Sequence, residues 1–262
     1  VFRVREVVYI WGVSWILEHR IALVTCSSNG LGKCILAALD ASGVKGLGFD
    51  TIVGTGSLPE NWIFHQGNVS LEADLLEAME KIRLHFGRLD IVVANAGLVP
   101  PWRKVEAVDM SEWDDVFAVN VRGVVITMKH AVPLMKNTGG SMILMGSLNS
   151  RRGHSGMTLY TSTKHAVLGI VRASAQDLGA YNIRVNALGP GPIATDALMA
   201  RIATRAEQGG PAVQTALRQF ESETALGRMA IEDEVAKTAL FLASDNSSGI
   251  TGQIFPIDAG LA

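Results

Sequence analysis

Short apolar runs alternate with amphipathic stretches along almost the whole chain. Apolar runs of this length are typical of buried strands, and the stretches between them have the length and period of helices. Strands joined through helices form β-α-β crossovers, which build a parallel sheet covered on both faces. The expected strands are 21–25, 44–50, 63–66, 91–94, 141–145, 183–187 and 253–257, and the expected helices lie near 31–41, 71–86, 112–135, 157–179 and 232–243.

This pattern predicts a single doubly wound α/β domain of about seven strands over residues 17–262, after an extension at 1–16. The uncharged run at 7–17 is shorter than the about 20 residues that span a bilayer, so no membrane span is expected. We expect the extension to pack on the body or on a partner subunit; the alternative is a surface membrane anchor. Residues 196–226 predict a mobile lid of two helical pieces joined at 209–211, and the stretch after Asp50 predicts a loop.

Charge and cysteine content exclude several classes of protein. The net charge of −2 and the isoelectric point near 6.3 show no basic surface of the kind that binds nucleic acid. The two cysteines, Cys26 and Cys34, are too few for a disulfide scaffold, which fits a reducing, cytoplasmic compartment. We interpret both as buried thiols rather than as a redox pair. No metal site is expected.

Polar and glycine-rich segments follow the ends of several expected strands. They are 25–32, Asp50, 95–97, Ser147 and 190–195. In an open parallel sheet, ligands bind outside the carboxyl ends of the strands, where the strand order reverses. The sequence therefore predicts one ligand site at this edge of the sheet.

The segment TCSSNGLG at 25–32 predicts a dinucleotide site. Gly30 and Gly32 allow close approach of a pyrophosphate, and the helix that follows offers unpaired N–H groups. Asp50 ends the second strand, where an acid accepts hydrogen bonds from the adenosine ribose and repels a 2′-phosphate. No Arg or Lys stands beside it at Thr51, so we expect NAD rather than NADP. Asn68 and Val69 are candidates for the adenine edge, although asparagine also caps helices.

Tyr160 and Lys164 are four residues apart and therefore share one face of a helix, and Ser147 precedes the tyrosine by thirteen residues. A tyrosine titrates near pH ~10, so a phenol needs help to act as a base at neutral pH. A cation at ~4 Å in a medium with a dielectric of ~20 contributes roughly 4 kcal/mol, or about three pKa units. We therefore expect Lys164 to lower the pKa of Tyr160. In isolation, the pair would be ordinary surface residues of a helix.

Together these residues resemble the short-chain dehydrogenase/reductase family, from about residue 17 to the C-terminus. The family patterns T-G-x-x-x-G-x-G, N-A-G, Y-x-x-x-K and N-x-x-x-P-G are matched in order by Thr25 with Gly30 and Gly32, by 95–97, by Tyr160 with Lys164, and by Asn186 with 190–191. The resemblance implies a Rossmann-like fold. Two positions depart from the pattern. Cys26 replaces the first glycine of the turn, which bears on cofactor affinity, and Asn68 replaces an aspartate but keeps an acceptor oxygen.

The resemblance also implies hydride transfer between a nicotinamide cofactor and a small alcohol or ketone substrate. Ser147 would bind the substrate oxygen, Tyr160 would exchange the proton, Lys164 would bind the nicotinamide ribose, and Asn120 would anchor a water that relays the proton. Thr195 would fix the carboxamide, although alone it would read as a helix N-cap. The cofactor-binding residues implied are Thr25, Ser28, Asn29, Gly30, Leu31, Asp50, Asn68, Val69, Asn95, Ala96, Gly97, Tyr160, Lys164, Pro190, Gly191, Ile193 and Thr195.

Relatives usually pair through the two long helices, here near 112–135 and 157–179, so a homodimer or homotetramer is expected. Two alternatives remain open from the sequence. One is an NADPH-dependent 3-ketoacyl thioester reductase, against which Asp50 argues. The other is a non-catalytic dinucleotide-binding scaffold, which only Cys26 favours.

Overall fold

The computed structural model describes residues 17–54, 58–207 and 209–261, and within them a seven-stranded, all-parallel sheet forms the centre of one domain. The strand order is β3-β2-β1-β4-β5-β6-β7, as expected for a doubly wound sheet. The predicted fold class is therefore confirmed. The strands are β1 (Ile21–Thr25), β2 (Lys45–Asp50), β3 (Trp62–Gln66), β4 (Ile91–Ala94), β5 (Gly140–Met145), β6 (Ile183–Pro190) and β7 (Ile254–Ile257). The extension at 1–16 lies outside the described residues.

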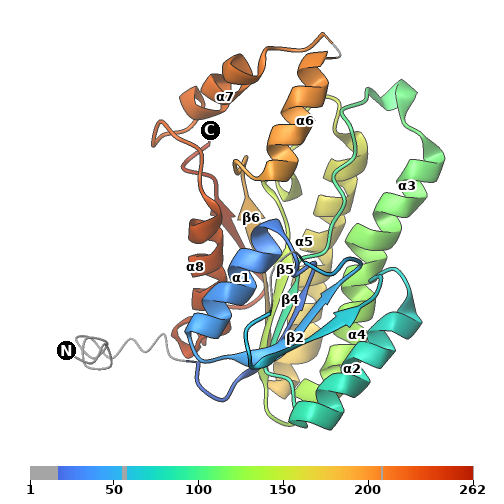
Figure 1. The fold of residues 1–262 in the computed structure, drawn as a ribbon, viewed down its shortest axis with the longest axis vertical. Helices are drawn as coiled ribbons and strands as arrows, with labels where there is room; N and C mark the ends of the chain where they lie inside the picture. The colour runs from blue at the N-terminus through green and yellow to red at the C-terminus, as the bar shows by residue number, and fades with distance from the viewer. Residues whose placement is uncertain (1–16, 55–57, 208, 262) are drawn as a thin grey trace.

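Helices cover both faces of the sheet (Figure 1). On one face, α1 (Gly30–Ala41) and α8 (Glu232–Ala243) share an apolar core with the sheet. On the other face, α2 (Glu72–Phe86), α4 (Gly123–Met135) and α5 (Thr158–Leu178) form the second core. All residues of β1 and β4 are buried, which explains why both strands are apolar apart from Thr25 at the end of β1. Among the described residues, no helix is both long and apolar enough to cross a membrane.

The helix expected at 112–135 is divided in the structure. It begins as α3 (Met110–Phe117), passes through a π-helical turn (η3, Ala118–Arg122) and continues as α4, which contains Pro133. Inside the π turn, the amide of Asn120 donates a hydrogen bond to Leu98 O at 2.8 Å and accepts one from Leu98 N at 2.7 Å. The wide turn thus coincides with a contact to the loop after β4.

The two pieces of the expected lid are α6 (Asp196–Glu207) and α7 (Val213–Ser222), and the described residues after Asp50 form a loop with no helix. Strand β6 runs to Pro190, three residues beyond the expected end at Ala187. The extra length pairs with β7 through Leu188, Gly189 and Pro190. Short 3₁₀ turns occupy Val105–Ala107 (η2), Leu148–Ser150 (η4), Gly179–Tyr181 (η5) and Asp245–Ser247 (η6).

Candidate active site

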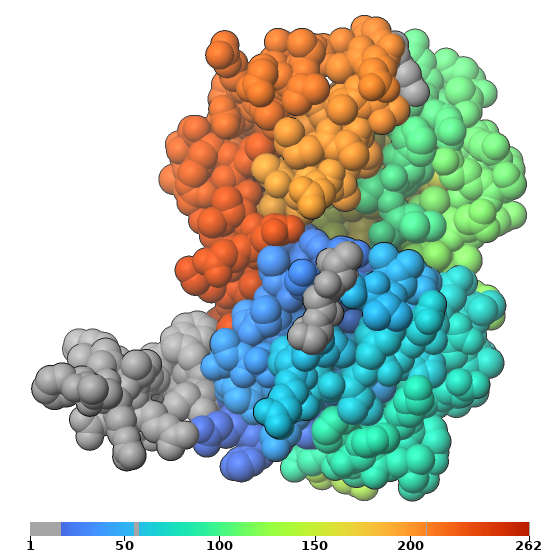
Figure 2. Space-filling model, viewed as in Figure 1, coloured from blue at the N-terminus to red at the C-terminus, as the bar shows by residue number. Residues whose placement is uncertain are grey.

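The predicted site residues gather at the carboxyl edge of the sheet. Strand β1 lies between β2 and β4, so the order reverses at the end of β1, beside the turn at 25–32. In the space-filling view, a recess lies below the orange lid, between the lid, the blue α1 region and the green segment (Figure 2). The recess follows the sheet edge at which a ligand is expected.

The turn between β1 and α1 is shaped to bring backbone close to a ligand. A Cβ on Gly32 would lie 1.9 Å from the carbonyl oxygen of Cys26, so only glycine fits there. Gly30 has a positive φ of 49°, and the N-cap Asn29 makes no side-chain cap hydrogen bond. The first N–H groups of α1 are therefore available to an anion, and a diphosphate fits this turn. Leu31 follows Gly30 in the first turn of the helix.

Cys26, the departure from the family pattern, keeps the conformation that a glycine would adopt. Its φ is +53°, in the left-handed region, which costs a non-glycine residue about 1–2 kcal/mol. Cys26 and Cys34 are both free cysteines and are half-buried, so the burial that we expected of them is only partial. Burial and the charge of Asp50 raise the pKa of Cys26 to about 11. The thiol is therefore protonated and unreactive at neutral pH.

Thr25 and Asn95 shape the turn. The Thr25 hydroxyl accepts hydrogen bonds from the backbone N–H groups of Asn95 and Ala96, both at 3.0 Å. The Asn95 amide donates to the carbonyl oxygens of Thr25 and Cys26. Because the Thr25 side chain is buried, these two residues lock the ends of β1 and β4 together. Thr25 and Asn95 therefore contribute to a cofactor site by fixing the position of the backbone segments that border it.

Asp50 lies at the end of β2 beside the same turn. Its Oδ2 accepts a hydrogen bond from Ser28 N at 2.9 Å, while Oδ1 has only long contacts of 3.4 Å to Thr51 and Ile52. One carboxylate oxygen therefore retains acceptor capacity for ribose hydroxyls.

Asn68 and Val69 follow β3. The Asn68 Oδ1 is engaged by the N–H and hydroxyl of Ser70, so its acceptor serves a local turn. The Val69 side chain is buried, and a Cβ on Gly123 would lie 2.8 Å from its Cγ2. Only the backbone of Val69 is therefore free to meet an adenine.

The candidate catalytic side chains come together at the end of β5 and the start of α5. Ser147 caps η4, where its hydroxyl accepts from Asn149 N at 3.2 Å, and it also hydrogen-bonds to Tyr160. Lys164 Nζ donates to the carbonyl oxygen of Met145 at 2.7 Å and lies 5.5 Å from the centre of the Tyr160 ring. An ammonium has three donors, so this one bond leaves capacity for a ligand.

The electrostatics of Tyr160 differ from our expectation. Burial raises the pKa of Tyr160, while the hydrogen bond with Ser147 and the positive charge of Arg201 act in the opposite direction. Lys164 is not among the causes. Its own pKa falls to about 8 because the side chain is buried. The predicted lowering of the tyrosine pKa by its neighbour was thus wrong for this state, because desolvation outweighs every favourable interaction.

The remaining predicted residues frame the site. Asn120 is fully buried, and its amide also donates to the hydroxyl of Thr163 at 3.2 Å. A Cβ on Gly97 would lie 3.4 Å from Asn120 Oδ1 and 3.7 Å from Lys164 Nζ, so the backbone of the exposed Gly97 lies beside both side chains. The Thr195 hydroxyl accepts from Leu198 N at 3.2 Å and caps the start of α6.

The loop after β6 is held from behind. Pro190 ends that strand, and a Cβ on Gly191 would lie 2.7 Å from the Cβ of Asp258. Ile193 is buried and bridges to Ala230. Among the described residues, no group of acidic, histidine and cysteine side chains could hold a metal ion.

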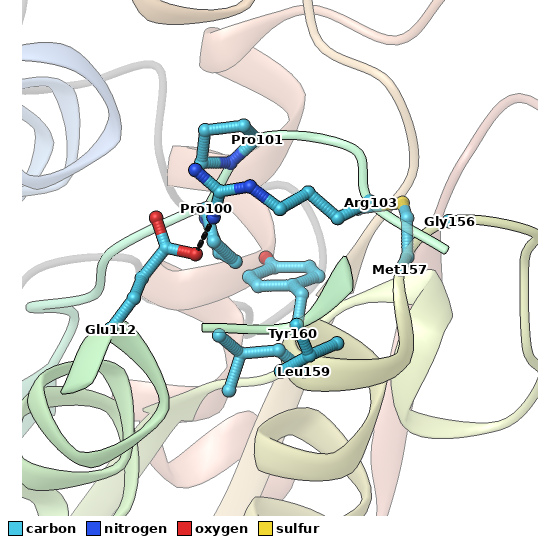
Figure 3. A pocket seen from close by; sticks show the side chains of 9 residues that line it. Pro100, Pro101, Arg103, Glu112, Gly156, Met157, Leu159 and Tyr160 are labelled. Atoms are coloured by element: carbon cyan, nitrogen blue, oxygen red, sulfur yellow. Dashed lines mark hydrogen bonds and ion pairs between the residues drawn. The ribbon is translucent and has the colours of Figure 1, made fainter. Parts of the chain in front are cut away.

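Two hollows adjoin the Ser147–Tyr160 pair. A narrow crevice is lined by Tyr160, Met157, Pro100, Pro101 and Arg103 among others, and Arg103 pairs there with Glu112 (Figure 3). A cavity of about 340 Å³ is lined by Ser147, Arg151, Arg152 and Asp258 among others. Sequence reasoning missed Arg201 as a neighbour of Tyr160, since 41 positions separate them and no motif links them.

Comparison with known proteins identifies the family. The profile of the family described as enoyl-(acyl carrier protein) reductase matches residues 54–262. A relative named short-chain dehydrogenase reductase 3c, from Arabidopsis thaliana, is 31% identical over an alignment that covers 93% of this chain and 95% of its own length. The chain belongs to the short-chain dehydrogenase/reductase family. As a member, it is an oxidoreductase that acts on CH–OH or keto groups with a nicotinamide dinucleotide.

Members with different named substrates are similar to this chain. A 3-oxoacyl-(acyl-carrier-protein) reductase of Thermotoga maritima is 34% identical over 94% of this chain and 98% of its own length. Xanthoxin dehydrogenase of Arabidopsis thaliana is 33% identical over 93% of this chain and 90% of its own. The solved aldohexose dehydrogenase of Thermoplasma acidophilum superimposes with a TM-score of 0.86 at 26% identity, covering 95% of this chain and 96% of its own. These names span several substrate classes, so the site itself has to indicate the substrate.

Proposed function

We propose that this short-chain dehydrogenase/reductase interconverts a secondary alcohol and a ketone with NAD(H), using Ser147, Tyr160, Lys164 and Asn120. One observation carries the proposal. The phenol is hydrogen-bonded to Ser147 and lies beside a buried ammonium whose only hydrogen bond among the described residues is to a backbone carbonyl. These three groups face the edge of the sheet at which the glycine turn binds a dinucleotide.

Each residue has a physical role in this reaction. The nicotinamide ring supplies the hydride acceptor or donor. Ser147 donates a hydrogen bond to the substrate oxygen and stabilises negative charge on it. Tyr160 takes the alcohol proton during oxidation and returns it during reduction. The two unused donors of Lys164 would bind the nicotinamide ribose, while Asn120 holds the loop at Leu98 and supports a proton-relaying water.

Asp50 supports the preference for NAD. Its carboxylate is 7% exposed and lies beside the turn, where an adenosine ribose reaches it and a 2′-phosphate would be repelled. The competing candidate is an NADPH-dependent 3-ketoacyl thioester reductase, which the name of the Thermotoga maritima relative favours. The carboxylate weighs against it in this chain.

The test is to mix the protein with NAD⁺ or NADP⁺ and a panel of secondary alcohols and to follow the absorbance of reduced nicotinamide. We expect turnover with NAD⁺ and its loss in Tyr160→Phe. Turnover only with NADP⁺ would overturn the cofactor preference. Dinucleotide binding without turnover of any alcohol or ketone, equal in wild type and Tyr160→Phe, would support a scaffold instead.

We further propose a homodimer or homotetramer that pairs through the α3–α4 segment and α5. Val125, an apolar residue of α4, is 45% exposed in the single chain, which fits such a surface. Light scattering of the purified protein tests this, and a monomer at micromolar concentration would contradict it. A cytoplasmic location remains a prediction.

A further inference from the structure

Arg201 of the lid lies against the loop that borders the catalytic tyrosine. Its guanidinium carbon is 4.2 Å from the centre of the Trp102 ring, and its Nη2 donates to the carbonyl oxygen of Pro100 at 3.3 Å. Pro100 and Tyr160 line the same crevice. The arginine therefore closes over the site from α6, and stacking on an aromatic ring holds its planar group in one orientation.

Within the described residues, no carboxylate forms an ion pair with Arg201. The neighbouring Arg103 is different, because Glu112 neutralises it. In addition, Nε of Arg201 is buried without an acceptor in the described part of the chain. A buried, unsatisfied N–H of a charged group is costly, so this position favours an acceptor brought by a ligand.

Arg201 is linked to the reacting group through the loop at Pro100, which Arg201 contacts and which lines the crevice beside Tyr160. Burial lowers the pKa of Arg201, and the charge of Tyr160 acts in the opposite direction; burial raises the pKa of Tyr160, and the positive charge of Arg201 lowers it. A substrate whose hydroxyl reaches Tyr160 therefore extends along the loop that Arg201 contacts.

We propose that Arg201, stacked on Trp102, binds a carboxylate of the substrate, so that the preferred substrates are short secondary hydroxy acids and their oxo acids. This inference rests on the proposed function. Written in full, a hydroxy acid and NAD⁺ give the oxo acid, NADH and a proton: the carbinol C–H leaves as hydride and the O–H proton leaves through Tyr160. The planar guanidinium binds a carboxylate through two parallel hydrogen bonds, which a neutral amide cannot match.

Two other arrangements would give different results. Arg201 and Trp102 could serve only to hold the lid closed, in which case substrate charge would not matter. Alternatively, Arg151, an exposed residue of the larger cavity beside Ser147, could be the anion site; Arg152 and Asp258 line the same cavity.

The experiment compares acid and amide partners that differ only in charge. The pairs are 2-hydroxybutanoate, 3-hydroxybutanoate and 4-hydroxypentanoate, each with its own amide, so that the carboxylate lies at three distances from the carbinol carbon. The kcat/KM of each is measured with NAD⁺ and NADP⁺, and binding to the enzyme–NADH complex is measured by calorimetry. The proteins are wild type, Arg201→Met, Arg201→Lys, and two controls, Arg205→Met and Arg151→Met. Arg205 is exposed and contacts the same indole at 5.0 Å.

We expect wild type to prefer at least one acid over its amide, and Arg201→Met to lose on the order of tenfold to hundredfold of that acid-to-amide ratio. Because the lost charge near Tyr160 acts on acid and amide alike, the ratio isolates the contact with the carboxylate. Arg201→Lys should restore part of it, and both controls should retain it. An equal loss for acid and amide in Arg201→Met would indicate lid closure alone and overturn the inference. The inference would also be overturned if the preference for the acid disappeared in Arg151→Met, or if wild type showed no preference for acid over amide in either kcat/KM or binding. If the enzyme oxidises only the amides, the proposed function stands and this inference is wrong. If no compound is turned over but the acids bind in a way that depends on Arg201, the proposed function is wrong and the anion site is supported.

Discussion

Replacing Lys164 with methionine should make the nucleotide-free protein more stable at neutral pH while abolishing activity. Lys164 is 3% exposed, and burial lowers the pKa of its ammonium from 10.5 to about 8. At about 1.36 kcal/mol per pKa unit, the shift corresponds to a penalty of about 3 kcal/mol for keeping this charge in the folded state. Methionine fills similar space without a charge, but leaves the Met145 carbonyl without its donor, which costs about 1 kcal/mol.

The sign of the pH dependence follows from proton linkage. The unfolded chain holds the lysine proton more tightly, so the penalty is complete below pH 8 and disappears as the pH rises toward 10.5. We therefore expect Lys164→Met to be about 2 kcal/mol more stable than wild type at pH 7, and its advantage to fall by about 3 kcal/mol between pH 8 and 10.5.

Urea unfolding of both proteins over this pH range, without nucleotide, measures the difference. Lys136→Met, which removes an exposed lysine at the end of α4, is the control and should show no such trend. The reasoning would be refuted if Lys164→Met were less stable than wild type, and by the same amount at pH 7 and at pH 10.5. Burying the lysine charge would then cost nothing.

Three further predictions concern the cofactor turn. Asp50→Asn keeps an acceptor for Ser28 N but removes the charge, so the ratio of kcat/KM with NAD⁺ to kcat/KM with NADP⁺ should fall by at least about tenfold. The surface variant Asp233→Asn should leave this ratio unchanged. An unaltered ratio in Asp50→Asn would disprove the role assigned to Asp50. The free energy of unfolding of Cys26→Gly should stay within about 1 kcal/mol of wild type, because the relief of backbone strain at φ +53° offsets the greater entropy of the unfolded chain. Cys26→Val should be less stable than Cys26→Gly by at least about 2 kcal/mol. Equal stabilities of the two variants would contradict the left-handed conformation at this position. Gly32→Ala should lose dinucleotide binding in calorimetry, since its Cβ would lie 1.9 Å from Cys26 O, and unchanged binding would show that the turn tolerates a side chain.

The sheet was predictable because its signals are local. The five residues of β1 and the four of β4 are all buried, and all but Thr25 are apolar, so the ends of both strands were predicted as observed. The two helices α6 and α7 were equally visible, because the glycines and proline at 209–211 separate two helical patterns. Motif residues at strand ends then converge simply because all parallel strands end at the same edge.

What the sequence did not reveal depends on contacts between distant segments. The π turn at 118–122 accompanies the hydrogen bonds between Asn120 and Leu98, and no local sequence pattern predicts it. The direction of the Tyr160 pKa depends on the packing and the charges around the phenol, which spacing to a lysine does not tell. Likewise, the stack of Arg201 on Trp102 joins the lid to the loop after β4 across 99 positions of sequence.

The most direct test of the account is where the hydrogen of the alcohol goes. A secondary alcohol that the enzyme oxidises, deuterated at its carbinol carbon, is incubated with NAD⁺ and either wild type or Tyr160→Phe, and the reduced dinucleotide is analysed by mass spectrometry and NMR. We predict that wild type places one deuterium on C4 of the nicotinamide, and that Tyr160→Phe forms almost no product. Reduced dinucleotide without deuterium, or equal rates for the two proteins, would contradict direct hydride transfer at this site.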